Sequence, residues 1–183
     1  MSYYRLRGGI SQVSGVMGLD NIILIGMPGS GKSSVGVVLA KAMGYGFVDG
    51  DLLIQQREGA LLQDILDSRG VEAFLDLEGE VLSSLECSRC VIAPGGSCVC
   101  REGAMAHLRS LGTVVYLSLS LAEVEGRIHN LDSRGIALQP GQTLADVYAC
   151  RAPLYEKYAH LTVETGGQSL AQTVMAVKEA LSR

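Results

Sequence analysis

A glycine-rich segment near the start of the chain has the residue types and spacing of a phosphate-binding loop. The segment is Gly26-x-x-x-x-Gly31-Lys32-Ser33, between an apolar run at residues 22–25 and a helical pattern. Its glycines allow the backbone to wrap a phosphate, and the following helix adds its positive end. Lys32 is expected to reach the β- and γ-phosphates, and Ser33 to coordinate Mg²⁺. The expected nucleotide is ATP, bound by Gly29, Ser30, Gly31, Lys32, Ser33 and Ser34.

Two carboxylates follow the next apolar run, in the segment Asp49-Gly50-Asp51. One of them can hold Mg²⁺ through water. The other can accept the proton of a substrate hydroxyl, or hold that hydroxyl in line with the γ-phosphorus. Asp-Gly-Asp is also a common composition for a solvated turn, and these residues alone do not separate the two interpretations.

Apolar runs and helical patterns alternate from residue 21 to the end of the chain. Short apolar runs predict strands over 21–26, 46–49, 91–94, 113–118 and 160–164. Helical patterns lie near 32–43, 52–58, 61–69, 71–88, 101–110, 121–130, 143–158 and 168–182. This alternation predicts an α/β fold with a parallel five-stranded sheet and helices on both faces. Ligands bind beyond the carboxyl ends of such strands, where both motifs lie.

Size and charge restrict the class of protein. The chain has 183 residues and is 48% hydrophobic, which suits one α/β domain, expected at 21–183 behind an extension at 1–20. The net charge is −4 and no basic run occurs, so we expect no nucleic-acid partner. No apolar run is long enough to span a membrane, and we expect a cytoplasmic monomer.

Five cysteines raise the question of a metal site. They include a Cys-x-x-Cys pair followed by Cys-x-Cys, and are Cys87, Cys90, Cys98, Cys100 and Cys150. The spacing does not match a zinc ribbon, and the apolar run 91–93 between the pairs is typical of a buried strand. We therefore expect free thiols that behave as small hydrophobic side chains.

The order of motifs along the chain resembles the shikimate kinase family. The phosphate loop and Asp-x-Asp are followed by a helical substrate-binding section at 70–78 and a Gly95-Gly96 turn. A lid from Arg127 through Arg134 and the motif Arg151-x-Pro-Leu-Tyr complete the set. The resemblance implies a P-loop NTPase-type fold with a mobile lid. It also implies ATP- and Mg²⁺-dependent phosphorylation of a small hydroxylated carboxylic acid. The leading acceptor is shikimate, which becomes shikimate 3-phosphate in aromatic amino acid biosynthesis.

The same resemblance implies roles on the nucleotide side of the site. Asp49 would help Ser33 to hold Mg²⁺, and Arg127 would lie near the adenine. Arg134 would come down with the lid onto the transferring phosphate, which needs cationic neutralisation and exclusion of water.

On the acceptor side, the resemblance implies that Asp51 binds the hydroxyl that is phosphorylated. Gly95 and Gly96 would offer backbone N–H groups to the substrate, and glycines after a buried strand permit such a close approach. Arg151 would bind the substrate carboxylate, whose two oxygens suit a guanidinium fork. The implied catalytic set is Lys32, Asp51 and Arg134.

The chain departs from the family pattern in the substrate section. It has Val71 where glutamate is usual, and Leu75 where the family has an arginine that binds the carboxylate. Glu78 thereby loses its expected neighbour and could pair with Arg151 instead. In the lid, Gly135 replaces the usual proline, and Ser97 replaces the third glycine of the turn.

Two other functions remain open. A related kinase could act on another hydroxy acid or on a polyol such as gluconate, because gluconate kinases also carry a phosphate loop and Asp-Gly-Asp. An ATP-binding regulatory module without kinase activity is the second, motivated by Val71 and Leu75. The Arg151-x-Pro-Leu-Tyr motif favours the shikimate-like branch, and the retained catalytic set argues against a module without activity.

Overall fold

The computed structural model of the protein describes residues 4–6, 20–128, 136–139 and 141–183. The predicted lid residues Arg134 and Gly135 lie outside the described residues. Across the described ranges we find no helix with the length and apolar character that crossing a membrane requires.

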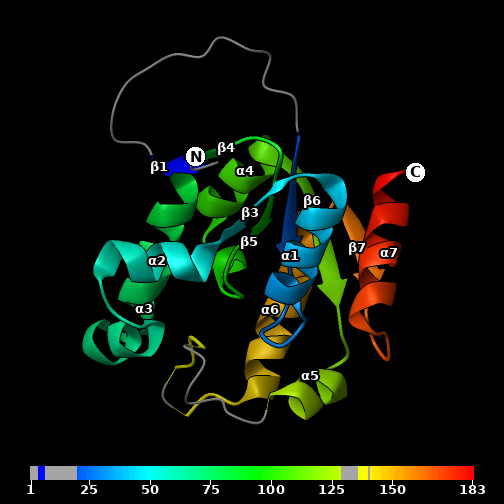
Figure 1. Ribbon diagram of the computed structural model, residues 1–183. Coiled ribbons are helices and arrows are strands. Elements are labelled where there is room, and N and C mark those ends of the chain that lie inside the picture. Colours follow the sequence, from blue (N-terminus) through cyan, green and yellow to red (C-terminus); the bar gives the residue numbers. More distant parts are fainter. Residues whose placement is uncertain (1–3, 7–19, 129–135, 140) are drawn as a thin grey trace.

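A five-stranded parallel sheet forms the centre of the molecule (Figure 1). Its strands, in spatial order, are β3 (Gly46–Asp49), β5 (Cys90–Ala93), β2 (Asn21–Ile25), β6 (Gly112–Ser118) and β7 (Leu161–Glu164). All five predicted strands are confirmed, each end within one residue of its prediction. Strand β2, which leads into the phosphate loop, lies in the middle and pairs with β5 and β6.

Helices cover both faces of this sheet, as predicted. Alternate residues of β2 point to opposite faces, and Ile22 and Leu24 pack against α1 (Lys32–Met43) and α7 (Leu170–Leu181). Ile23 and Ile25 belong to the larger core on the other face. That core is covered by α2 (Gly50–Glu58), α3 (Leu62–Ser83), α4 (Glu102–Leu111), α5 (Leu121–Arg127), α6 (Leu144–Tyr158) and the short helix η1 (Cys98–Cys100).

The region around α3 differs from its prediction in one respect. The predicted helices 61–69 and 71–88 meet at Gly70, whose φ of 78° breaks the helical path, so the boundary is confirmed. The second helix ends at Ser83 instead of residue 88. Strand β4 (Leu85–Cys87) follows it and pairs antiparallel with β1 (Tyr4–Leu6), and neither strand was predicted. The backbone of 85–87 is extended because a distant segment supplies its hydrogen-bond partners, and a local pattern cannot show this.

The five cysteines are free thiols that differ in exposure. Cys90 and Cys98 are buried, Cys87 and Cys100 are half-buried, and Cys150 is exposed. Among the described residues, no three His, Cys, Asp or Glu side chains are placed to hold one metal ion.

Candidate active site

The phosphate loop bends sharply between β2 and α1. Gly29 and Gly31 have φ of 79° and 91°, a left-handed region in which other residues are strained, and Gly31 is the N-cap of α1. The Ser30 side chain is buried and does not line the pocket described below, whereas Ser33 and Ser34 do. The first turn of α1 therefore points its N–H groups at the space where an anion would bind.

Lys32 lies folded back over this loop. Its Nζ donates hydrogen bonds to the carbonyl oxygens of Gly26 at 2.9 Å and Met27 at 3.0 Å. Burial lowers the pKa of the Lys32 ammonium, and the Asp51 carboxylate partly offsets this by favouring the charged form. The cation is thus held in position by two neutral acceptors, which an incoming phosphate can replace.

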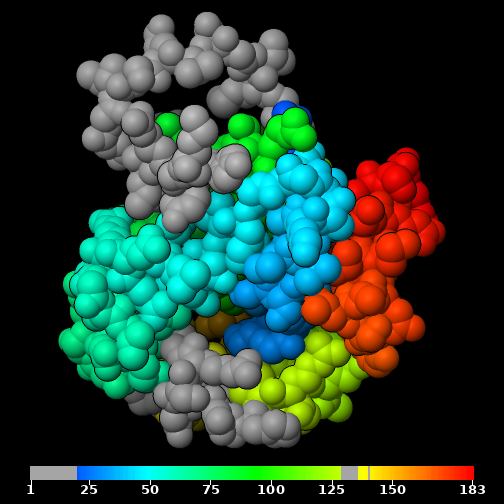
Figure 2. All heavy atoms as spheres, in the orientation of Figure 1, coloured from blue at the N-terminus to red at the C-terminus, as the bar shows by residue number. Residues whose placement is uncertain are grey.

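A pocket of about 530 Å³ lies beyond the carboxyl ends of β2, β3 and β5. Figure 2 shows the surface hollowed between the teal helices α2 and α3 and the blue segment that carries the phosphate loop. The lining includes most of the predicted site residues, namely Gly29, Gly31, Lys32, Ser33, Ser34, Asp51, Gly95, Gly96, Arg127 and Arg151. Segments far apart in the sequence therefore meet in one cavity, as expected for this class of sheet.

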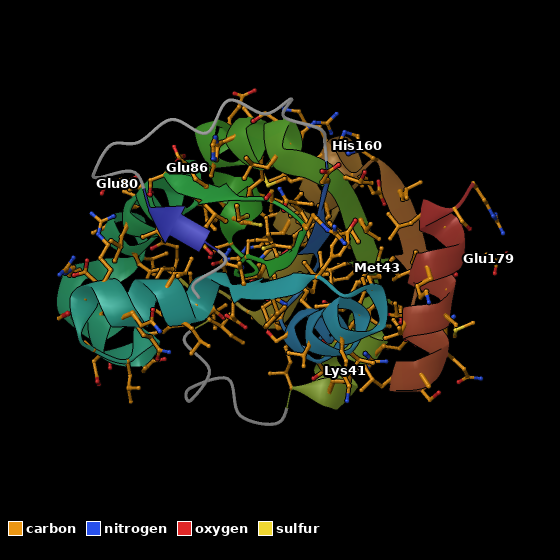
Figure 3. The ribbon with its side chains drawn as sticks, turned by 45° about the horizontal axis from the view of Figure 1, so that its top comes forward. Lys41, Met43, Glu80, Glu86, His160 and Glu179 are labelled. Atoms are coloured by element: carbon orange, nitrogen blue, oxygen red, sulfur yellow. The ribbon has the colours of Figure 1, made fainter. Side chains whose placement is uncertain are left out.

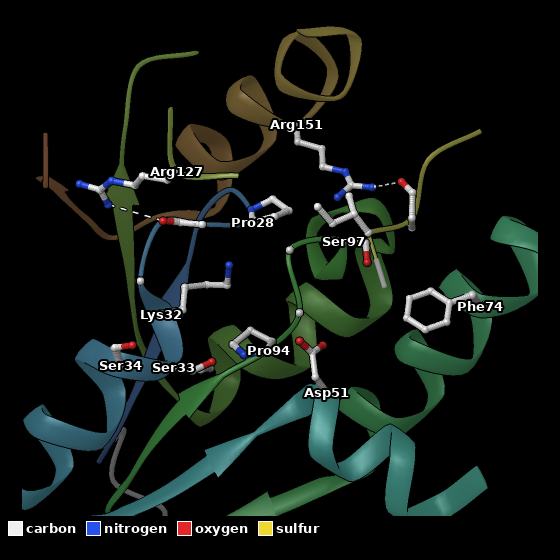
Figure 4. Close-up of a pocket in the computed structure, with 17 residues that line it drawn as sticks. Pro28, Lys32, Ser33, Ser34, Asp51, Phe74, Pro94, Ser97, Arg127 and Arg151 are labelled. Carbon is white, nitrogen blue, oxygen red and sulfur yellow. Dashed lines mark hydrogen bonds between the residues drawn. The ribbon is translucent and has the colours of Figure 1, made fainter. Parts of the chain in front are cut away.

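Two arginines lie toward opposite ends of this pocket (Figure 4). Arg127 donates to the carbonyl oxygens of Gly29 at 3.5 Å and Thr165 at 3.3 Å, beside the phosphate loop. Arg151 comes from α6 and is 6% exposed, and it donates to the carbonyl of Ala137 at 2.8 Å. Lys32 lies between them. The pocket therefore offers a cation at each end and one in the middle.

The two aspartates that follow β3 lie in different environments. Asp49 is the N-cap of α2, and its Oδ1 accepts from the backbone N–H of Asp51 at 3.0 Å and of Leu52 at 3.4 Å. Its Oδ2 has no hydrogen bond to another described residue. Asp49 Oδ2 and the hydroxyl of Ser33, which lines the pocket, are oxygen ligands of the kind that Mg²⁺ prefers.

Asp51 points into the pocket. Burial, followed by the nearby Asp49 carboxylate, raises the pKa of Asp51 to about 6, and Lys32 acts in the opposite direction. At neutral pH the group is mostly ionised, yet it is basic enough to accept a proton from a hydroxyl that is being phosphorylated.

Residues to which the sequence assigned no role in binding or catalysis also line the pocket. They include Phe74, Pro28, Pro94, Ser97, Ile136 and Ala137. Tyr155, one helical turn after Arg151, donates its hydroxyl to the carbonyl of Gly96 and so fixes the glycine turn. The Arg151-x-Pro-Leu-Tyr spacing already indicated that Tyr155 lies on the same side of the helix as Arg151, because residues four apart share a helix face.

Glu78 is a buried carboxyl group next to the pocket. It is 2% exposed, and burial raises the pKa of its carboxyl to about 7, with the hydrogen bond from Ser97 acting in the opposite direction. The pairing with Arg151 considered from the sequence is absent, because the ion pairs between described residues include none between them. Leu75, where the family has arginine, is 6% exposed and packs in the apolar core.

The Gly95-Gly96 turn passes between acidic side chains and the phosphate loop. A Cβ on Gly95 would lie 2.2 Å from Glu78 Oε1 and 2.9 Å from Asp51 Oδ1. A Cβ on Gly96 would lie 3.0 Å from Pro28 Cδ. A side chain at position 95 would require these carboxyl groups to move, and one at position 96 would press on the Pro28 ring.

Gly95→Ala is therefore expected to displace the two carboxyl groups that flank the turn. We expect a loss of about 1–3 kcal/mol in the free energy of unfolding and at least a tenfold drop in activity, because overpacking shifts the Asp51 carboxylate. Urea unfolding and steady-state kinetics measure the two effects. Gly103→Ala is the matched control, since nothing lies within 4 Å of a Cβ there. Wild-type behaviour of Gly95→Ala would contradict the proximity described here.

The raised pKa of Glu78 predicts a pH dependence of stability. The usual value is 4.5 and the folded value about 7, so between these values the folded state binds more protons than the unfolded state. The free energy of unfolding contributed by this group therefore falls as the pH rises through that window, by about 3 kcal/mol in all. Urea unfolding at about pH 4.5 and pH 7.5 measures this change. Between the two pH values the free energy of unfolding should fall by about 3 kcal/mol more in the wild type than in Glu78→Gln. Equal losses in the two proteins would contradict the shift.

Comparisons with known proteins agree with this geometry. A sequence model of the family described as shikimate kinase matches residues 28–182 of the chain. The shikimate kinase of Paracidovorax citrulli (strain AAC00-1) is 39% identical to the chain over 164 residues, which is 86% of this chain and 89% of that protein.

Solved structures give the same result. The structure of shikimate kinase from Acinetobacter baumannii in complex with shikimate has a TM-score of 0.81 at 31% identity, covering 90% of this chain and 93% of that one. A gluconokinase from Sinorhizobium meliloti 1021 has a TM-score of 0.52 at 26% identity over 90% and 93% of the two chains. The overall structure is therefore more similar to that shikimate kinase than to that gluconokinase.

Proposed function

Since the chain belongs to the shikimate kinase family, we propose that it transfers the γ-phosphoryl group of ATP to a hydroxyl of shikimate. The observation that carries the proposal is the meeting of three groups in one pocket. These are the phosphate loop with Lys32, the Asp51 carboxylate and the Arg151 guanidinium. A nucleoside triphosphate, a hydroxyl and a carboxylate are the partners that these groups recognise.

The nucleotide side of the proposed mechanism uses the loop and α1. The first-turn N–H groups of α1 bind phosphate oxygens, and Lys32 exchanges its two carbonyl partners for the β- and γ-phosphates. Arg127 lies near the adenine. Mg²⁺, when bound, neutralises charge on the phosphates, and Ser33 and Asp49 are the residues that would hold it.

The acceptor side uses the opposite wall of the pocket. Arg151 binds the carboxylate of the acceptor, and the backbone N–H groups of Gly95 and Gly96 face it. Asp51 orients the hydroxyl toward the γ-phosphorus and takes its proton as the phosphoryl group transfers. Arg134 completes the catalytic set in this proposal, although it lies outside the described residues.

The remaining parts of the proposal concern the protein as a whole. We place the kinase domain at residues 21–183 and treat residues 1–20 as an extension, whose strand β1 pairs with β4. We also propose that the protein acts as a monomer in the cytoplasm without a nucleic-acid partner. The lack of a basic run and the net charge of −4 support the last point.

ADP release by the purified protein tests the function. We expect release from ATP and Mg²⁺ to depend strongly on added shikimate and not on gluconate, with shikimate 3-phosphate as the product. Release that depends on gluconate would favour the related polyol kinase. Nucleotide binding without acceptor-dependent release, over a screen of hydroxy acids and polyols, would favour a regulatory module.

Arg151→Leu tests the acceptor assignment. Loss of a buried guanidinium from a carboxylate site costs about 2 kcal/mol or more, so KM for shikimate should rise about 30-fold or more while KM for ATP stays near its wild-type value. Steady-state kinetics with each substrate varied in turn measures this split. Arg183→Leu, on the exposed end of the chain, is the control and should behave as wild type. An unchanged KM for shikimate in Arg151→Leu would remove Arg151 from the acceptor site.

A further inference from the structure

The acceptor end of the pocket has an unusual balance of charge. The helix α3 presents Phe74 to the pocket, and the next residue, Leu75, is buried in the apolar core and supplies no cation. Lys32 is directed at the phosphate loop. Among the described residues that line this end, Arg151 is then the cation left for an acceptor carboxylate.

Glu78 lies one helical turn beyond Leu75, against the wall of the same pocket. Its Oε1 is buried and has no hydrogen-bond partner among the described residues. That oxygen lies against Gly95, 2.2 Å from where a Cβ would be, and the nearby Ser97 side chain favours the ionised form of the carboxyl. Gly95 and Ser97 both line the pocket, and Glu78 packs against Gly95 on the side away from the cavity.

Charged and titratable groups face Glu78 from several elements. Asp51 on α2 disfavours its ionised form, whereas Arg151 on α6 and Lys32 on α1 favour it. The remaining titratable neighbours are the buried thiol of Cys98, the half-buried thiol of Cys100 and the buried phenol of Tyr155, and burial raises the pKa of all three. These three are neutral at physiological pH, so the local charge depends on Glu78, Asp51, Arg151 and Lys32.

We propose that Glu78 is a positioning residue that must carry its proton when a carboxylate-bearing acceptor binds beside Arg151. Ionised Glu78 would add a second buried negative charge next to Asp51, and it would compete with the acceptor carboxylate for the Arg151 guanidinium. Protonated Glu78 removes that competition and keeps the Gly95 wall in place. Acceptor binding is therefore coupled to a proton on Glu78, because position 75 supplies no second cation. This inference rests on the proposed function for the carboxylate of the acceptor.

The pH dependence of KM tests the coupling. If only the protonated form binds, KM for shikimate should rise about tenfold between pH 6 and pH 8 in the wild type, while KM for ATP changes little. Glu78→Gln cannot ionise, and its KM for shikimate should stay constant over that range. This variant also separates Glu78 from Asp51, which remains titratable in it. Glu80→Gln is the matched control on the same helix, at an exposed position, and should keep the wild-type profile (Figure 3).

A calorimetric measurement gives a readout that needs no turnover. Titration of shikimate into the wild type at about pH 8, in buffers of different ionisation enthalpy, should show uptake of about one proton per molecule bound. Glu78→Gln should show none. Superimposed KM profiles of wild type and Glu78→Gln, or binding of shikimate without proton uptake, would overturn the inference.

Failure of the proposed function can be distinguished from failure of the inference about Glu78. A wild type that neither binds nor phosphorylates shikimate at any pH would refute the function, and infrared spectroscopy of the ligand-free protein then tests separately whether Glu78 carries the proton that the inference requires. A protonated-carboxyl band at about pH 6.5 that is clearly stronger in the wild type than in Glu78→Gln, where only Asp51 still contributes, would support a neutral Glu78. Identical spectra of the two proteins would overturn it.

Discussion

Lys32→Ala is expected to lower kcat/KM about 10³-fold or more without unfolding the protein. Nζ of Lys32 is held by the carbonyls of Gly26 and Met27, at the entrance to the first turn of α1. A phosphoryl transfer depends on positioning and on charge stabilisation, and a buried cation fixed at the phosphates contributes to both. Alanine removes the positive charge. The carbonyl oxygens of Gly26 and Met27, which Lys32 no longer binds, then repel the phosphate oxygens.

The measurement is acceptor-dependent ADP release, paired with thermal unfolding to show that the variant is folded. Lys41→Ala is the matched control, because Lys41 is exposed on the outer surface of the same helix (Figure 3). It should retain wild-type kinetics. Activity of Lys32→Ala within tenfold of the wild type would refute the assignment of this loop as the triphosphate site.

Much of this arrangement was predictable from local patterns. The strand that ends at Ile25, the glycines of the loop and the helix from Lys32 are fixed by short stretches of sequence, and the structure places them as predicted. The position of Asp51 followed from the rule that the carboxyl ends of parallel strands share one edge. The break at Gly70 was visible because only glycine tolerates the φ observed there.

Contacts between distant segments were not predictable in the same way. The pattern over 84–88 predicted helix, but Leu85–Cys87 forms a strand because it pairs with Tyr4–Leu6, some eighty residues away. The packing of Gly96 on Pro28, and of Glu78 on Gly95, depends on how α3 and the loop approach each other. Only the structure shows that the carboxyl of Glu78 is buried and not paired with Arg151, since the sequence gives the residue type but not its neighbours.

Asp51→Asn is expected to lower kcat about 10²- to 10⁴-fold and to leave nucleotide affinity close to that of the wild type. The amide keeps the shape and one oxygen of the carboxylate but cannot take the proton of the acceptor hydroxyl. The phosphate loop and Lys32 stay in place, since Lys32 is held by backbone carbonyls and not by Asp51. The loss should therefore appear in turnover and not in the dissociation constant for ATP.

The pH profile separates a role in proton transfer from a merely structural one. Burial raises the pKa of Asp51 to about 6, so the kcat of the wild type should fall as the pH is lowered through that value, where the carboxylate becomes protonated. The residual activity of Asp51→Asn should lack this acidic limb. Asp64→Asn, at an exposed position on α3, is the control and should keep both the rate and the limb. An Asp51→Asn variant with wild-type turnover, or with the acidic limb intact, would show that another group accepts the proton.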